Sequence, residues 1–148
     1  MSASAKNFFT KIQQAEILLA IKSAELDTSG EIRVHIESHY HGDVLDRAAQ
    51  VFDKLKMQNT KLRNGVLFYL SIDNRKFAVI GDAGVNAVVK DDFWNNVMTI
   101  MTEYFIEGNF TEGLIEGIKQ VGEELKKFFP YQDDDVNELP DEISFGEN

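Results

Sequence analysis

A continuous apolar run, Val66–Leu70, constrains the fold of this chain more than any other feature of its sequence. The run directly follows the turn-forming pair Asn64-Gly65 and contains no charged or strongly polar residue. A strand with one face in water alternates apolar and polar residues, whereas a strand that is covered on both faces is apolar throughout. The run therefore predicts a central strand with helices packed on both sides of its sheet.

Two further segments are predicted to join this strand in one sheet. Residues 31–39 alternate apolar and polar side chains, as a strand with one strongly apolar face does. Residues 43–57 return to helical spacing and connect this strand to the apolar run, which predicts a right-handed parallel unit. The pair Asp73-Asn74 then predicts a tight turn into an antiparallel strand over residues 76–80.

Helices are predicted before, between and after the strands. The sequence of residues 10–13 has the pattern of a capping box that opens the first helix. Asp91 is the predicted N-cap of a later helix, and the last helix is expected over residues 111–129. Within it, Gly113 and Gly117 would let the helix lie close against a neighbour. The element order predicts the α/β class, with a three-layer α/β/α sandwich around a small mixed sheet.

Acidic residues are concentrated at the C-terminal end of the chain. The 148 residues include 25 acids and 15 bases, which gives a formal net charge of −10. Residues 131–148 hold seven of the acids and no Lys or Arg, which leaves a charge of −3 on residues 1–130. We therefore predict one folded domain over 1–130 and a disordered acidic tail over 131–148. No basic patch is found, so no nucleic-acid partner is expected.

Several other classes are excluded or disfavoured. The chain has no Cys, so it has no disulfide, no thiolate nucleophile and no sulfur-ligated metal. Its first residues show no basic segment followed by an apolar core, and a secretory signal is not expected. The longest apolar runs are far shorter than a membrane span, so membrane insertion is not expected either. These features favour a soluble, cytoplasmic monomer.

Five aspartates gather in two predicted loops. Asp82 ends the third predicted strand, and Asp91 and Asp92 precede the next helix, while Asp43 and Asp46 lie in the loop after the first strand. If both loops lie at the same edge of the sheet, their carboxylates repel each other unless a cation lies between them. Carboxylate oxygens are ligands of calcium and magnesium, which predicts a divalent-metal site, with calcium favoured and magnesium second. The alternative is that these aspartates only cap helices and form turns.

No catalytic motif stands out, and no catalytic residue is assigned. The sequence lacks the nucleophile elbow of serine hydrolases and the phosphate-binding loop of nucleotide hydrolases. The enzyme hypothesis that remains is metal-assisted hydrolysis, in which ions at Asp82, Asp91 and Asp92 would polarise a phosphoryl group and activate water. Lys90 and Arg33 are the basic residues that this hypothesis would use to hold the phosphate.

Five strings of the sequence, in order and within residues 10–130, resemble the TPM domain family: Thr28–Glu37, Arg63–Leu67, Arg75–Asp82, Asp91–Trp94 and Phe105–Gly113. The resemblance implies an α/β/α sandwich around a four-stranded mixed sheet, so a short or irregular fourth strand is expected beside the three strands above. It also implies loops near the strand ends that hold a divalent metal, usually calcium. Phosphatase activity is attributed to some members of the family.

The functional hypothesis combines the loops with the resemblance. We expect a soluble, stand-alone TPM-like domain that binds a divalent metal, with calcium favoured, through its acidic loops. Metal occupancy would change a surface that an unidentified protein partner recognises, which makes the domain a binding or regulatory module. The alternative is a metal-dependent phosphatase that acts on phosphomonoesters.

Overall fold

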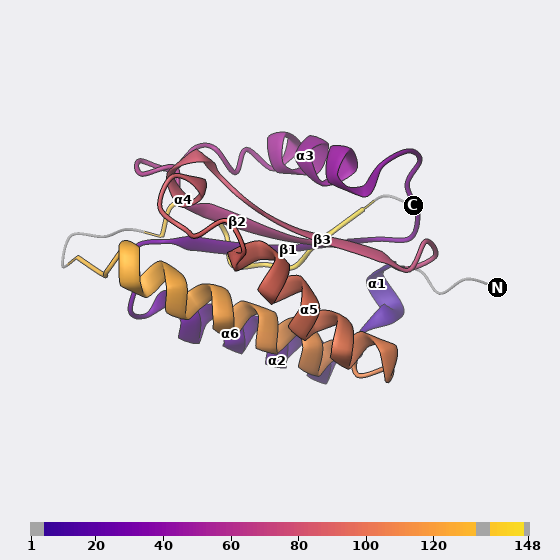
Figure 1. The fold of residues 1–148 in the computed structure, drawn as a ribbon. Coiled ribbons are helices and arrows are strands. Elements are labelled where there is room, and N and C mark those ends of the chain that lie inside the picture. The colour runs from indigo at the N-terminus through magenta and orange to yellow at the C-terminus, as the bar shows by residue number, and fades with distance from the viewer. Residues whose placement is uncertain (1–4, 133–136, 147–148) are drawn as a thin grey trace.

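Four strands form one mixed sheet in the order β3-β2-β1-β4 (Figure 1). β1 (Glu31–Glu37) and β2 (Gly65–Ser71) are parallel and paired along their whole length, and β3 (Lys76–Gly81) is antiparallel to β2. β4 (Ser144–Phe145) is parallel to β1. The sheet confirms the predicted parallel unit and hairpin, and the two-residue β4 is the expected short fourth strand.

The helices lie in two layers, one on each face of the sheet (Figure 1). The computed structural model describes residues 5–132 and 137–146. One face is covered by α2, α5 and α6, and the other by α3. The helices within the described ranges are α1 (Ala5–Phe8), α2 (Lys11–Glu25), α3 (Val44–Lys54), α4 (Ala83–Asn86), α5 (Phe93–Ile106) and α6 (Phe110–Phe128).

β2 lies at the centre of the molecule, and all seven of its residues are buried. Its even-numbered side chains contribute to the larger core beneath α2, α5 and α6, and Leu67 and Tyr69 contribute to a smaller core beneath α3. The complete burial of this strand explains why its sequence is apolar without alternation. The predicted three-layer α/β/α sandwich is therefore observed.

The helix boundaries follow the local signals closely. The capping box is present, because the Thr10 side chain accepts a hydrogen bond from Gln13 N–H while the Gln13 side chain accepts one from Thr10 N–H. At α5 the prediction is wrong by one residue, since Asp92 rather than Asp91 occupies the N-cap position. A Cβ atom on Gly117 would lie 2.6 Å from Met101 Sδ of α5, which confirms the predicted close approach of the two helices.

The C-terminal segment, which we define as residues 137–146, does not follow the expectation of disorder. Its Leu139 side chain is buried against the core beneath α3, and Gly146 N–H donates a hydrogen bond of 2.8 Å to Ile36 O of β1. The segment is ordered because β1 would otherwise present an unpaired edge and because Leu139 finds an apolar site. Residues 133–136 and 147–148 of the predicted tail lie outside the described residues.

Among the helices of the described ranges, none has both the length and the apolar content needed to cross a bilayer.

Candidate metal centre

Asp82 is held in an ion pair. Its Oδ2 lies 2.7 Å from Arg63 Nε and its Oδ1 lies 2.8 Å from Arg63 Nη2. The N–H of Ala83 also donates to Oδ1 at 2.7 Å, so Asp82 caps the short helix α4. Both carboxylate oxygens of this buried residue therefore already have protein donors.

Asp43 and Asp46 lie at the opposite end of the sheet from Asp82. They follow the C-terminal end of β1, beside the end of β2, whereas Asp82 follows β3, whose last residue pairs near the start of β2. The expectation that the two acidic loops share one edge is wrong, because the antiparallel hairpin reverses the chain direction between them. Asp43 serves as the N-cap of α3 and accepts hydrogen bonds from the N–H groups of Leu45 and Asp46, at 2.8 and 3.2 Å.

Asp91 and Asp92 are exposed at the start of α5, and Asp92 makes no side-chain capping bond there. Within the described part of the chain, none of the five predicted aspartates belongs to a set of three potential metal-ligating side chains. Their assignment to a metal remains a prediction.

The structure brings a different set of three carboxylates together. Glu25 is the last residue of α2, Glu31 is the first residue of β1, and Asp141 belongs to the C-terminal segment. One carboxylate oxygen of each lies within 4.8 Å of the others. We call Glu25, Glu31 and Asp141 the acidic triad; the short turn between α2 and β1 positions the first two, and the docked C-terminal segment supplies the third.

Backbone groups fix two of these carboxylates in place. The N–H of Ile32 donates to Glu25 Oε2 at 2.8 Å, and the N–H of Glu138 donates to Glu31 Oε1 at 2.6 Å. Two buried oxygens are left without a donor among the described residues, Glu31 Oε2 and Asp141 Oδ1. Glu31 is only 2% exposed, so its second oxygen is also shielded from water. Buried polar atoms without a partner are rare, which marks the triad as an incomplete arrangement.

The pKa values of the triad residues show that the triad lacks a compensating positive charge. Burial raises the pKa of Glu25 to about 9, with further contributions from a hydrogen bond to the Asp141 side chain and from the charges of Asp141 and Glu31. Burial also raises the pKa of Glu31 to about 7, although the hydrogen bond from the N–H of Glu138 acts in the other direction. The triad therefore favours a bound positive charge, either a proton or a cation.

The chemistry of the triad suits a hard divalent cation. It offers only carboxylate oxygens, which calcium and magnesium accept, and neither imidazole nor thiolate, which zinc and copper favour. The unpartnered oxygens of Glu31 and Asp141 are the two atoms that such an ion would satisfy.

Sequence patterns alone did not reveal the triad. Glu25 and Glu31 flank a turn of only five residues, and this spacing is the signal that could have paired them. Asp141 carries no such signal, because it lies in the segment that was expected to be disordered and is 110 residues away from Glu31. Only the docking of the C-terminal segment brings it to the site.

The family model of the TPM domain matches residues 3–124. The chain belongs to the TPM domain family. Glu25 and Glu31 of the acidic triad lie inside the matched part of this TPM domain, and Asp141 lies beyond it. Among curated proteins, none matches the chain.

Solved structures share the fold. The BA42 protein from the psychrophilic bacterium Bizionia argentinensis is 48% identical, with a TM-score of 0.89, and the match covers 95% of this chain and 97% of that one. The N-terminal domain of a protein from P. gingivalis is 22% identical, with a TM-score of 0.67 and coverage of 82% and 78%. The N-terminal domain of the cg2496 protein from Corynebacterium glutamicum is 13% identical, with a TM-score of 0.64 and coverage of 80% and 74%. The last two show the fold alone.

Proposed function

We propose that this TPM domain binds a divalent cation, calcium in preference to magnesium, at the acidic triad. The observation that carries the proposal is Glu31 Oε2, a buried carboxylate oxygen that has no donor among the described residues and lies beside two other carboxylates. A divalent cation would compensate the charge of all three side chains at once. Protons compensate them in its absence, in agreement with the raised pKa values of Glu25 and Glu31.

The preference for calcium follows from the origin of the ligands. The three carboxylates come from a helix end, a strand start and the C-terminal segment, which do not impose octahedral symmetry. Calcium accepts irregular sets of about six to eight oxygens, water included, whereas magnesium demands near-octahedral geometry and gives up its water reluctantly.

The site gives the domain a means of responding to metal. Glu25 and Glu31 belong to the body of the domain, and Asp141 belongs to the segment that supplies β4 at the edge of β1. A bound cation would hold this segment in place, and its loss at neutral pH would leave like charges repelling across the same contact. Release of the segment would expose an unpaired strand edge, which is a surface that extended peptides bind. We therefore propose a metal-responsive binding module.

Calorimetric titration of the chelator-treated protein with calcium tests the site. Glu31→Gln and Asp141→Asn each remove one ligand charge, and we expect each to weaken calcium binding by about tenfold or more. The matched control is the double variant Asp91→Asn with Asp92→Asn, which changes two exposed aspartates and should leave the affinity unchanged. Magnesium is titrated in parallel and should bind more weakly.

Two outcomes would contradict the proposal. If the control variant loses calcium affinity while Glu31→Gln keeps it, the metal is bound by the loop aspartates and the triad is not the site. If the unsubstituted protein binds no calcium at millimolar concentration, the domain is not a calcium-binding module at all.

A second candidate, a metal-dependent phosphatase, is favoured by one observation. Arg33 lies two residues after Glu31 on β1, and its buried Nε has no hydrogen-bond partner within the described ranges. An arginine beside a cation can hold a phosphate group. Turnover of p-nitrophenyl phosphate with calcium or magnesium would support this candidate if Arg33→Gln and Glu31→Gln both abolish it. Turnover equal to that of a buffer blank would refute it.

A further inference from the structure

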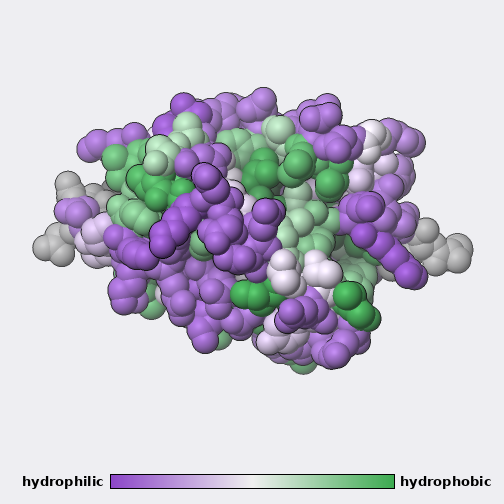
Figure 2. Space-filling model, in the orientation of Figure 1, coloured by the Kyte–Doolittle hydropathy of each residue, from purple (hydrophilic) through white to green (hydrophobic). Residues whose placement is uncertain are grey.

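A cavity of about 850 Å³ lies at the end of the sheet remote from the acidic triad. Its walls come from α1, the end of β2, the start of β3, the C-terminal half of α5 and the start of α6. The space-filling view shows apolar side chains between the sheet and the C-terminal end of α5, on the right of the molecule (Figure 2). The size is within the range of small-molecule sites.

Four phenylalanines form most of the apolar wall. Phe77 packs edge-on against Phe105, Phe105 contacts Phe110, and Phe110 packs edge-on against Phe8, with ring centroids 4.9 to 5.4 Å apart. Beside them, the side chain of Ile106 is 79% exposed and that of Phe110 is 37% exposed. Aromatic rings in a continuous row at an open cavity offer an apolar body a large contact area without further reorganisation.

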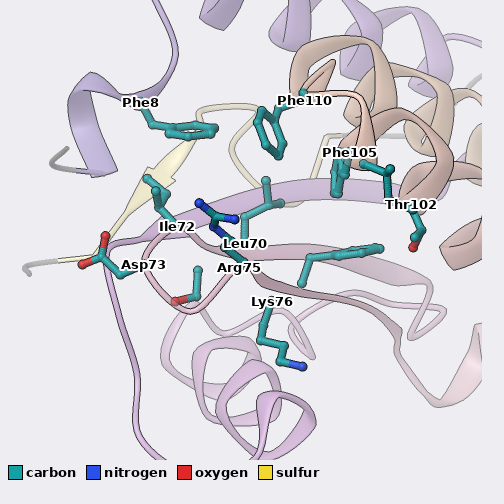
Figure 3. Close-up of a pocket in the computed structure, with 13 residues that line it drawn as sticks. Phe8, Leu70, Ile72, Asp73, Arg75, Lys76, Thr102, Phe105 and Phe110 are labelled. Atoms are coloured by element: carbon teal, nitrogen blue, oxygen red, sulfur yellow. The ribbon is translucent and has the colours of Figure 1, made fainter. Parts of the chain in front are cut away.

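The polar end of this cavity is cationic. In Figure 3 the guanidinium group of Arg75 extends toward the rings, whereas the side chains of Lys76 and Asp73 point away from them. Within the residues that the structure describes, the Arg75 side chain takes part in no hydrogen bond or ion pair. Arg63, the other arginine with a positive φ, is by contrast paired with Asp82.

The backbone of Arg75 adds a second argument. Its φ is +52°, a left-handed conformation that the hairpin turn requires and that glycine adopts without strain. An arginine at this position is unfavourable for the turn itself, so the turn does not explain the residue. Its side chain instead supplies the only guanidinium group at a cavity with four aromatic rings among the residues that line it.

We propose that this cavity binds a small organic anion with an apolar body, namely an aliphatic or aromatic carboxylate. The apolar body lies against Phe8, Phe105 and Phe110, and the carboxylate accepts two parallel hydrogen bonds from Arg75. Polar ligands such as sugars are disfavoured by the rings, and cations by Arg75. This proposal is independent of the metal site, which lies at the other end of the sheet.

The test is a titration with decanoate below its micellar concentration, followed by amide-resolved NMR. We expect saturable shifts confined to residues 70–77 and 102–110. Decanol has the same tail without the charge and should bind about tenfold more weakly, because it loses the charge-assisted hydrogen bonds. Acetate, which has the charge without the tail, should produce no saturable shift.

Three variants distinguish decanoate binding by Arg75 from a general effect of net charge or of a disturbed turn. Arg75→Gln should weaken decanoate binding by about tenfold, since it removes the cation. Lys76→Gln is the matched control, because it makes the same change of charge at the next residue, whose side chain points away; it should leave binding unchanged. Arg75→Gly should weaken binding as much as Arg75→Gln while it keeps the fold, since glycine suits a φ of +52°.

The proposal is overturned by any of three results. Equal effects of Arg75→Gln and Lys76→Gln would mean that only net charge matters. Equal binding of decanol and decanoate would mean that the rings act without an anion site. Shifts of the cavity residues on dilution, with sedimentation showing a dimer, would mean that a second copy of the chain occupies the cavity.

Discussion

Glu37 is 0% exposed, and three neighbouring side chains decide its charge state. Arg47 Nε and Nη2 donate to its two oxygens at 2.7 and 2.8 Å, Tyr69 donates a hydrogen bond from its hydroxyl, and His35 Nε2 lies 3.5 Å away. Burial alone would raise the pKa of Glu37, but the hydrogen bonds from Arg47 and Tyr69, with His35 close by, lower it below its ordinary value. His35 also contacts the Ser144 hydroxyl at 2.9 Å, so this network connects the strand to the C-terminal segment.

We predict that Glu37→Gln lowers the free energy of unfolding by about 3 kcal/mol, because it leaves the charge of Arg47 without its partner. Urea unfolding monitored by circular dichroism measures the change. The control is Glu16→Gln, on α2, which alters an exposed carboxylate and should change stability by less than about 0.5 kcal/mol. Equal effects of the two substitutions would show that the Glu37 network is not a stabilising one.

At the scale of elements, the C-terminal segment shows how a mostly acidic stretch can be ordered. Glu138 accepts a hydrogen bond from Lys61 N–H at 3.0 Å, and its own N–H donates to Glu31. Leu139 is 6% exposed and lies in the same core as Met57 and Leu67. The segment is held by backbone pairing, by the buried Leu139, and by Ile143 and Phe145, which pack against the larger core. Composition averaged over residues 131–148 does not reveal these contacts.

We predict that Leu139→Ala lowers the free energy of unfolding by about 2 kcal/mol, since it removes a buried leucine from this anchor. Leu26→Ala is the matched control, because the Leu26 side chain is 73% exposed and its loss should have little effect. Both are compared by urea unfolding, and limited proteolysis reports release of the segment. An unchanged stability of Leu139→Ala would mean that the segment is not docked in solution.

At the scale of the whole molecule, the net charge of −10 is not the quantity that governs stability near neutral pH. Most carboxylates among the described residues are exposed. Glu25 and Glu31 differ, since burial raises their pKa values to about 9 and about 7. The charges of Asp141 and Glu138 face the same site and add to the repulsion.

The predicted pH dependence follows from these two residues. Between their ordinary and raised pKa values, the folded protein retains protons that the unfolded chain has released, so stability falls as pH rises. In chelator, we expect the melting temperature to fall from about pH 5 to about pH 9. Saturating calcium should raise it most at the alkaline end, because the cation takes the place of the protons. The pKa of Glu37 is lowered, so Glu37 has the opposite effect on stability. Its contribution is lost as the pH falls, and only in the acid range.

Thermal unfolding followed by circular dichroism at several pH values checks this prediction. Glu31→Gln is the informative variant, because it should flatten the pH profile and also remove much of the calcium effect. A flat profile of the unsubstituted protein in chelator, or a calcium effect that is the same at all pH values, would contradict it.

The local pattern of the sequence determined the elements and the class of fold. The capping box at Thr10, the apolar run of β2 and the spacing of Gly113 and Gly117 each depend on neighbours a few residues away, and each is observed. Such signals are readable because helix and strand impose fixed periods on the chain. The N-cap of α5 was misplaced by one residue, since two adjacent aspartates meet the same local criterion.

The tertiary structure alone decided which charges meet. Loop composition suggested that the aspartates at 43 and 82 share an edge, but strand direction places them at opposite ends of the sheet. The acidic triad depends on the docking of Asp141, a long way along the chain from Glu25 and Glu31. Similarly, Arg75 lines the same cavity as the rings of α1, α5 and α6 only because the hairpin turn lies beside these helices. The periods of helices and strands can be read from residues that are close in the sequence. Contacts between distant charges depend instead on the order and direction of the strands.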